Sequence, residues 1–452
     1  MDQVYDCIII GAGYAGLSAA RALTAAGKRV LVLEARDRVG GRAWTKHYGD
    51  GTYEDYGAAF LGNQHTQMHK LAIEFNIRIF DLFTKGKSIL HYRGRARAYS
   101  SALTPPLSIW GLVNAHFTLR AFDKICNSVD LDKPWETPNA RELDLITAAD
   151  WCHRNCWSTE VKEMMFAAFE LFWGLNSSQI SILHAAFYCK SGVSFQHLST
   201  MQDGAQQQII RGGGQAIADA LHRELGDAVR LDEPVVGVDQ TGSDHATIKT
   251  TKGIFSCRRV IMAIPPPLVP KVEFSPALPA PKVKLLGNLS MGAFWKIFAS
   301  YDTPFWRKNG LRGEVVGVDS YVMLVNDVSP EDASRGVLMG FIAGTKALEF
   351  LSMSEDQRLA IVMKELEKCY GAAALKPKKL TLHTMMEEKW STGCPVASPA
   401  PGIWTTLGEW LRKPTGRIHW AGTETAEVWN GYMEGAVNSG RRAAREVLGE
   451  LE

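Results

Sequence analysis

Short apolar runs separated by glycine-rich turns open the chain. Residues 7–10 are apolar throughout, an alanine-rich stretch follows a glycine turn, and a second apolar run covers residues 30–33. A strand that is apolar on both faces is typical of a buried parallel sheet, and the stretch between the two runs has helical spacing. The pattern predicts a strand–helix–strand unit whose two strands lie side by side.

Farther along, the hydrophobic period changes several times. Helical spacing dominates from about residue 80 to 205, with Trp, Phe and Met dense between 164 and 173, which indicates a separate helical layer. Apolar or alternating runs predict strands at 230–238, 259–264, 294–301, 320–325 and 418–420. Helices are predicted at 354–369 and 433–448. The runs at 294–301 and 320–325 alternate, so we expect them in a second sheet.

Bulk composition narrows the kind of partner. At 452 residues the chain is longer than one hydrophobic core usually covers, so two domains are expected. Its 50 Lys and Arg balance 48 Asp and Glu without a block of one sign, which argues against a nucleic-acid partner. There is no run of about 18 apolar residues and no basic leader, so we expect no membrane anchor and a cytoplasmic location.

The eight cysteines are scattered, which favours free thiols in a reducing compartment. Cys152, His153 and Cys156 are close enough on a helical pattern to resemble metal ligands. No second ligand pair stands at the spacing of a zinc site, so we predict an ordinary helix surface there and no metal.

A glycine motif follows the first predicted strand. Gly11, Gly13 and Gly16 form a GxGxxG run, with Ala15 inside it, that opens the predicted helix. In this context the first glycine allows the tight turn, the second lets the backbone approach a pyrophosphate, and the third allows close helix–strand packing. The helix N-terminus then binds the phosphates through its free N–H groups.

A cluster of charged residues and glycines after the second predicted strand indicates which dinucleotide is bound. Glu34 stands at the end of the second strand, where a carboxylate accepts hydrogen bonds from ribose hydroxyls and would repel the extra phosphate of NADP. Ala35, Arg36, Gly41 and Arg42 follow at once. A nicotinamide dehydrogenase has no need of this glycine and arginine cluster, whereas a deeply buried FAD needs more donors around its pyrophosphate. FAD is therefore the predicted cofactor.

Five segments carry a resemblance to a known family. They read IIIGAGYAGLSAARAL, LVLEARDRVGGRAWT, RRVIMAIPPPL, PFWRKNG and GRIHWAGTETAEVWNGYMEGAVNSGRRAAREVL. The chain resembles the flavin-containing monoamine oxidases over nearly its whole length. The resemblance implies an α/β fold in which a Rossmann-like FAD-binding domain of the glutathione reductase type is interleaved with an α+β substrate domain. We expect the FAD-binding domain at 1–80, 207–290 and 390–452, and the substrate-binding domain at 81–206 and 291–389.

The resemblance also implies which residues contact the cofactor. Further contacts are expected from Gly57, Ala58, Val235, Cys394, Gly422, Thr423, Tyr432 and Met433. Val235 matches the residue that binds the adenine end through its main chain. Tyr432 and Met433 begin the last predicted helix, whose N-terminus would stabilise negative charge on the pyrimidine part of reduced flavin.

Catalytic and substrate-binding residues follow from the same resemblance. Lys296 stands where the family has a lysine bonded through water to flavin N5, and we expect it to promote reoxidation by oxygen. Tyr432 matches one of two aromatic side chains that flank the amine. Phe60, Phe172, Gln206 and Phe341 are the expected pocket residues.

At residues 394 and 395 the chain departs from the family pattern. Pro395 stands where the second aromatic wall would be, and Phe60 replaces a tyrosine found in several members. The pocket should therefore differ in width and polarity. Cys394 matches the cysteine that forms a thioether to the flavin in animal members. Many microbial relatives bind FAD without a covalent bond, so we expect a free thiol, with the thioether as the alternative.

The resulting prediction is an FAD-dependent amine oxidase. It would dehydrogenate a small amine to an imine, which hydrolyses, while O2 is reduced to H2O2. Two alternatives remain: a flavin-dependent desaturase or dehydrogenase of a biosynthetic pathway, and a flavin-stabilised scaffold protein. The sequence does not identify the amine or the fate of the imine, and it leaves a homodimer open.

Overall fold

The computed structural model describes residues 4–100 and 106–451. Its first elements are β1 (Val4–Ile10), α1 (Tyr14–Ala25) and β2 (Val30–Leu33). β1 pairs in parallel with β2 and with β13 (Ile254–Met262), so it is buried on both faces. The predicted strand–helix–strand unit is confirmed, because only an apolar strand can lie between two parallel neighbours and two covering layers.

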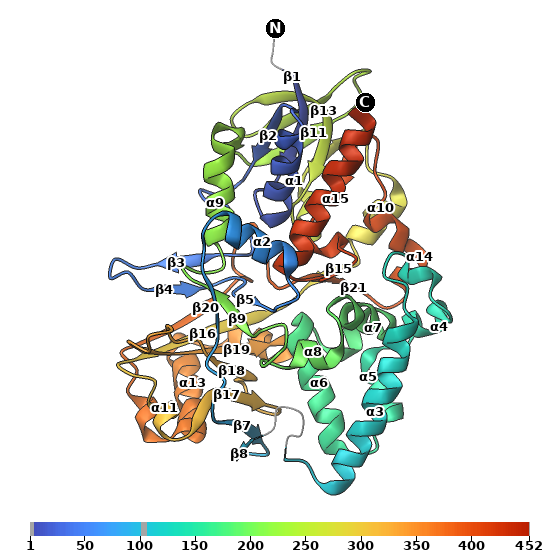
Figure 1. Cartoon of the computed structure of the whole chain (residues 1–452). Coiled ribbons are helices and arrows are strands. Elements are labelled where there is room, and N and C mark those ends of the chain that lie inside the picture. The colour runs from blue at the N-terminus through green and yellow to red at the C-terminus, as the bar shows by residue number, and fades with distance from the viewer. Residues whose placement is uncertain (1–3, 101–105, 452) are drawn as a thin grey trace.

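The first sheet has the order β10-β2-β1-β13-β12-β11-β14, and β22 pairs with β13 at its carboxyl end. The strands beyond those already given are β10 (Val229–Arg230), β11 (Val235–Asp239), β12 (Ala246–Thr250), β14 (Glu273–Ser275) and β22 (Ile418–Trp420). The chain reaches this sheet from three distant segments. α1 and α15 (Met433–Leu451) lie side by side against it (Figure 1). A Cβ at Gly440 would come within 2.0 Å of the Ala15 carbonyl oxygen, so only glycine permits this approach.

The second sheet has the order β20-β16-β19-β18-β17-β7-β8 and is antiparallel except between β17 and β7. Its strands are β7 (Lys87–Tyr92), β8 (Arg95–Tyr99), β16 (Phe294–Tyr301), β17 (Leu311–Gly317), β18 (Leu324–Asp327), β19 (Gly336–Ala343) and β20 (Lys379–Thr384). The expectation of a second sheet is therefore confirmed. The helical expectation for residues 80–99 is wrong, because this stretch contains the hairpin of β7 and β8, and β7 also pairs with β17.

A helical layer lies beside the second sheet (Figure 1). Its members are α3 (Ile109–Ser128), α4 (Ala140–Leu145), α5 (Ala148–Asn155), α6 (Thr159–Trp173), α7 (Ile182–Ser191) and α8 (Phe195–Ser199). α3, α5, α7 and α8 each begin after a Ser or Thr whose hydroxyl accepts a first-turn N–H, which explains where they start. Cys152 and Cys156 are buried between these helices, so the expectation of a plain helix surface there is wrong.

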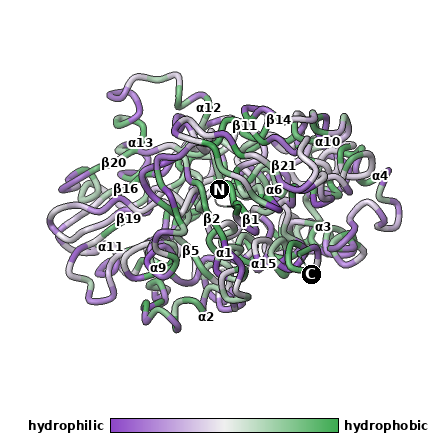
Figure 2. Tube along the Cα trace, turned by 90° about the horizontal axis from the view of Figure 1, so that it is seen from above, coloured by the Kyte–Doolittle hydropathy of each residue, from purple (hydrophilic) through white to green (hydrophobic). Residues whose placement is uncertain are grey.

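Shorter elements connect the two sheets. One small sheet has three strands, β5 (Phe60–Leu61), β6 (Ile79–Asp81) and β9 (Gln208–Ile210). Two further sheets have two strands each: β3 (Thr45–His47) with β4 (Tyr53–Asp55), and β15 (Leu289–Met291) with β21 (Ala397–Pro399). The other helices are α2 (Thr66–Glu74), α9 (Ala216–Leu225), α10 (Ala280–Leu286), α11 (Phe305–Lys308), α12 (Gly344–Leu351), α13 (Glu355–Tyr370) and α14 (Ile403–Leu407). Seen from above, the outer loops are largely hydrophilic (Figure 2). Within the described residues, every helix is too short or too polar to cross a membrane.

Candidate active site

One continuous cavity of about 840 Å³ lies where the carboxyl ends of β1 and β2 approach the face of the second sheet. In open α/β sheets, ligands bind at this edge. The cavity is lined by Gly11, Gly13, Ala15, Glu34, Ala35, Arg36, Gly41, Arg42, Gly57, Ala58, Phe60, Phe172, Gln206, Val235, Lys296, Phe341, Cys394, Gly422, Thr423, Tyr432 and Met433. All the site residues expected from the sequence are therefore brought together except Gly16.

The glycine motif forms a backbone cradle at one end of this cavity. Gly11 has a positive φ of 104°, which a side chain would strain, and a Cβ there would meet the Ala263 carbonyl oxygen at 2.8 Å. At Gly13 a Cβ would find no atom closer than 3.9 Å, so the space beside it is free for a ligand. Gly16 packs against Gly11 and does not reach the cavity, in keeping with a packing role.

Glu34 fixes the turn that precedes α1. Its Oε2 accepts the Ala12 backbone N–H at 2.7 Å, while Oε1 accepts the N–H of Arg36 at 3.1 Å. The Arg36 guanidinium contacts Glu34, Glu388 and Ser391. Oε1 thus accepts two bonds from Arg36, whereas Oε2 accepts only one, so Oε2 can still receive a hydroxyl from a ligand.

Arg42 links three distant segments beneath the cavity. Its guanidinium donates to both oxygens of Glu424, at 2.6 and 2.9 Å, and to the Pro395 carbonyl oxygen at 2.8 Å. This two-point geometry is the strong form of an ion pair. Arg42 thus holds the loop that carries Cys394 against the loop that leads into α15.

Lys296 reaches the cavity from the middle of β16. Its Nζ donates to the carbonyl oxygens of Asp55, at 2.8 Å, and Gly57. Burial lowers the pKa of Lys296 to about 8, and Asp55 and Cys394 oppose that shift. The ammonium group therefore loses its proton far more readily than an exposed lysine does.

Aromatic rings form the wall near the start of α15. Tyr432 lies beside Tyr188, with ring centroids 6.2 Å apart, and Phe172 stacks on Tyr188 at 6.1 Å. Burial raises the pKa of both tyrosine hydroxyls, so both stay neutral. The Thr423 hydroxyl donates to the Tyr432 carbonyl oxygen at 3.0 Å and fixes the turn before the helix.

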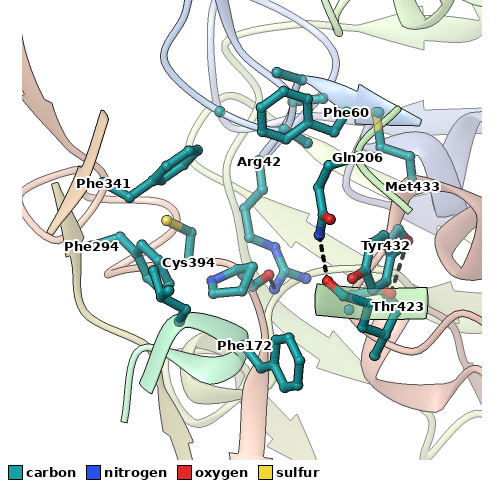
Figure 3. A pocket seen from close by; sticks show the side chains of 18 of the residues that line it. Arg42, Phe60, Phe172, Gln206, Phe294, Phe341, Cys394, Thr423, Tyr432 and Met433 are labelled. Carbon is teal, nitrogen blue, oxygen red and sulfur yellow. Dashed lines mark hydrogen bonds between the residues drawn. The ribbon is translucent and has the colours of Figure 1, made fainter. Parts of the chain in front are cut away.

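The opposite wall comes from the second sheet and the 394 loop. Phe341 and Phe294 make an edge contact at 6.3 Å, and the Cys394 thiol lies near them (Figure 3). Burial raises the pKa of Cys394 to about 11, although Lys296 and Arg42 oppose the shift, so the thiol is protonated at neutral pH. Gln206 lines the cavity, and its amide nitrogen donates to the Leu198 carbonyl oxygen at 3.1 Å.

Comparison with known proteins identifies the chemistry. A family model for flavin containing amine oxidoreductase matches residues 14–448. The chain belongs to this family. It is 36% identical over 446 residues to a Mycobacterium tuberculosis protein named flavin-containing monoamine oxidase AofH, covering 99% of this chain and 97% of that one. It is 34% identical to amine oxidase B of Cavia porcellus, covering 100% and 87%.

Solved structures agree with this assignment of the amine oxidase fold. Cyclohexylamine oxidase from Brevibacterium oxydans superposes with a TM-score of 0.95 at 30% identity, covering 99% of this chain and 100% of that one. Putrescine oxidase bound to putrescine gives 0.95 at 28% identity, with 99% and 100% covered. The chain is an FAD-dependent amine oxidase, and the fold and family expected from the sequence are confirmed.

The cavity of this amine oxidase fits FAD. The free space beside Gly13, the uncapped N-terminus of α1 and the acceptor Glu34 suit the phosphates and ribose of a dinucleotide. At the far side, the N-terminus of α15 follows Tyr432 and faces the cavity. Pro395, where the sequence departs from the family pattern, is among the residues that line the cavity.

Sequence reasoning missed several cavity residues of this amine oxidase. Tyr188 lies on α7, where nearly every position is buried, so periodicity gave no sign of a special face. Leu324, Glu314 and Asn326 come from strands of the second sheet, and only the three-dimensional pairing of β17 with β18 places them in the cavity. A carboxylate two positions after an arginine and directly before two valines, at Glu314, is a signal that could have been noticed.

Proposed function

We propose that this amine oxidase binds a small neutral amine between Tyr432 and the second sheet and oxidises it at its α-carbon. The supporting observation is that one cavity contains the backbone cradle of the glycine motif, Lys296 and the aromatic wall at Tyr432. FAD, when bound, accepts the two electrons removed from the amine and delivers them to O2. The imine then hydrolyses, so amine, O2 and water give carbonyl compound, ammonia and H2O2.

The residues at the cradle would hold the cofactor. Gly11, Gly13 and Ala15 leave room for the pyrophosphate beside α1, and Glu34 offers its oxygens to the ribose. The register of β11 shifts between Val235 and Gly237, which leaves the main chain at Val235 irregular and supports its proposed contact with the adenine end. Ala35, Arg36, Gly41, Arg42, Gly57, Ala58, Gly422, Thr423 and Met433 are the proposed remaining contacts.

The aromatic wall would orient the amine and exclude water. Tyr432, supported by Tyr188 and Phe172, gives a flat apolar surface, and Phe60 and Phe341 face it from the other side. Only a neutral amine has the free lone pair needed for oxidation, and a dry chamber favours the neutral form. Gln206 is the proposed polar contact for the amine.

Lys296 would act on the oxygen side of the reaction. Its two carbonyl acceptors keep the ammonium group in place beside the cavity. A positive charge at this point stabilises negative charge that forms on oxygen as it is reduced. We propose that Lys296 orders the water and O2 needed for H2O2 formation.

Several finer features belong to the proposal. We propose that FAD is bound without a covalent bond, because the Cys394 thiol is protonated and hence a weak nucleophile. We place the enzyme in a reducing compartment such as the cytosol on the strength of its eight free cysteines. The two-domain division at residues 80, 206, 290 and 390 is likewise part of the proposal, and a homodimer is compatible with it.

The decisive experiment uses the purified yellow protein and a panel of primary, secondary and cyclic amines. Amine-driven bleaching of the flavin without oxygen, and H2O2 release with oxygen, are the expected results. Bleaching without H2O2 release would point to a dehydrogenase with another electron acceptor. No bleaching with any amine would contradict the proposal and favour the scaffold alternative.

A further inference from the structure

The face of the second sheet forms the floor of the cavity away from the glycine cradle. Each of five neighbouring strands contributes a lining residue: Lys296 on β16, Phe341 on β19, Leu324 on β18, Val316 on β17 and Leu90 on β7. Phe341 pairs with both Lys296 and Leu324, and Leu324 pairs with Val316. Beyond Lys296 this row is apolar.

Two polar residues lie next to the apolar row. Glu314 precedes Val316 by two positions, and Asn326 follows Leu324 by two. Because β17 and β18 are antiparallel, both side chains emerge on the same face as the row and beside each other. Both line the cavity, and Tyr99 on β8 lines it nearby.

Glu314 is bound on one side only. Its Oε2 accepts from Ser88 and lies 2.6 Å from Nη2 of Arg312, and these two partners do not line the cavity. No hydrogen bond from the described residues reaches Oε1. The side chain is 10% exposed, so an open acceptor is held at the cavity surface by a buried pair.

Asn326 is a second unsatisfied group at the same place. The residue is 2% exposed, and its Nδ2 has no hydrogen-bond partner among the described residues. Buried amides are nearly always paired, so the unpaired Nδ2 marks a side chain that the described residues do not hold in one orientation. An ammonium group needs an acceptor, and rotation of the amide plane can present Oδ1 to it.

We propose that Glu314 and Asn326 bind a second amino group of the substrate, which makes long-chain diamines the preferred amines. The assignment rests on the proposed function. A primary ammonium has three donors, and Glu314 Oε1, Asn326 Oδ1 and the Tyr99 hydroxyl are three acceptors on residues that line this part of the cavity. Arg312 offsets most of the long-range charge of Glu314, so recognition depends on short hydrogen bonds.

The length of the diamine follows from the sheet. Lys296 and Glu314 are three strands apart, or about 14 Å at the usual strand spacing. Side chains on one face of a sheet extend in parallel, so this spacing is the distance that the diamine has to cover. An extended chain covers about 1.2 Å per bond, so up to about twelve bonds separate the reacting carbon from the second nitrogen.

The test compares amines of equal length with the holoenzyme. The substrates are octylamine, 8-amino-1-octanol and 1,8-diaminooctane, with shorter and longer diamines, and kcat/KM is measured by H2O2 release. The expected kcat/KM is at least tenfold higher for the diamine than for octylamine, since a hydrogen bond to a charged group contributes about tenfold or more. An amino alcohol as good as the diamine would overturn the assignment of an ammonium site.

Variants of Glu314, Arg312 and Asn326 test whether these residues cause the preference for the diamine. Glu314→Gln should lower the diamine-to-monoamine ratio about tenfold, chiefly through KM for the diamine. Because Glu314→Gln leaves Arg312 unpaired, the double variant R312Q/E314Q removes both charges, and Asn326→Leu removes the second acceptor without touching the pair. Both should show the same loss. Asp319→Asn, at an exposed carboxylate in the turn between β17 and β18, is the matched control and should keep the ratio.

The two proposals fail in different ways. Oxidation of neither octylamine nor any diamine would contradict the proposed amine oxidation itself. Normal oxidation of octylamine with no diamine preference, or a preference that survives Glu314→Gln and R312Q/E314Q, would refute the second binding site alone.

Discussion

Replacement of Lys296 by methionine measures the cost of the buried ammonium group. Its pKa falls from 10.5 to about 8 on folding, and each pH unit corresponds to about 1.4 kcal/mol, so at pH 7 burial of the charge costs about 3 kcal/mol. Between pH 8 and 10.5 the unfolded chain binds more protons than the folded one. The stability of the wild type therefore rises with pH across this window.

The substitution Lys296→Met removes this pH-dependent contribution. It also leaves the carbonyl oxygens of Asp55 and Gly57 without their donor, which costs about 1–3 kcal/mol each. At pH 7 the removed charge penalty and these lost bonds are of similar size. The difference in free energy of unfolding between the wild type and Lys296→Met is therefore small at pH 7. Its change with pH is more informative than its value at one pH.

The assay is urea unfolding of the wild type and Lys296→Met holoenzymes at pH 7 and pH 9.5. Between these two pH values the free energy of unfolding of the wild type should rise by about 2 kcal/mol relative to the variant. The reason is that pH 9.5 lies 1.5 units above the pKa of Lys296 in the folded protein. Lys364→Met, at an exposed lysine of α13, controls for general pH effects. A difference between wild type and Lys296→Met that does not change with pH would refute the argument.

Three further predictions concern the cofactor and the amine. Gly13→Ala should leave the Tm of the apoprotein within about 2 °C, because its φ of −75° suits alanine and the Cβ meets no atom closer than 3.9 Å, yet weaken FAD binding at least tenfold in a fluorescence titration. Acid precipitation of the wild type should release the yellow colour into solution, as it should for Cys394→Ser; colour retained only by the wild type would show a thioether. Tyr432→Ala should lower kcat/KM at least tenfold and Tyr432→Phe much less, because the ring rather than the hydroxyl forms the wall; equal losses would contradict this.

Local sequence patterns were sufficient to predict the part of the site that would bind the nucleotide end of the cofactor. The turn at Gly11, the helix after it and the carboxylate of Glu34 lie within one strand–helix–strand unit, where short-range geometry decides the structure. The C-terminal block around Thr423 and Tyr432 was found by resemblance, since its place beside Gly11 depends on β22 pairing with β13. No local signal could supply that contact.

The substrate end depends on long-range pairing. Residues 80–99 carry a weak pattern that reads as helix, yet β7 pairs with β8 in a hairpin and with β17, a parallel partner more than 200 residues later. Glu314 and Asn326 are separated by a turn, and their common direction follows only from the register of β17 with β18. Tyr188 is hidden on a helix that is buried on all sides.

The strands of the second sheet set the length of the substrate in the proposed diamine site. The reacting end is fixed by β16 and the start of α15, whereas the remaining cavity floor is a row of single side chains on successive strands about 4.8 Å apart. A substitution on β19, β18 or β17 thus changes the cavity at a defined distance from Lys296 without moving it. An acidic side chain on one of these strands selects diamines of one length, and moving the carboxylate by one strand, as in Leu324→Glu with Glu314→Gln and Arg312→Gln, should shorten the preferred diamine by about four bonds. A preferred length that is the same in this triple variant as in the wild type would show that the sheet does not set the length.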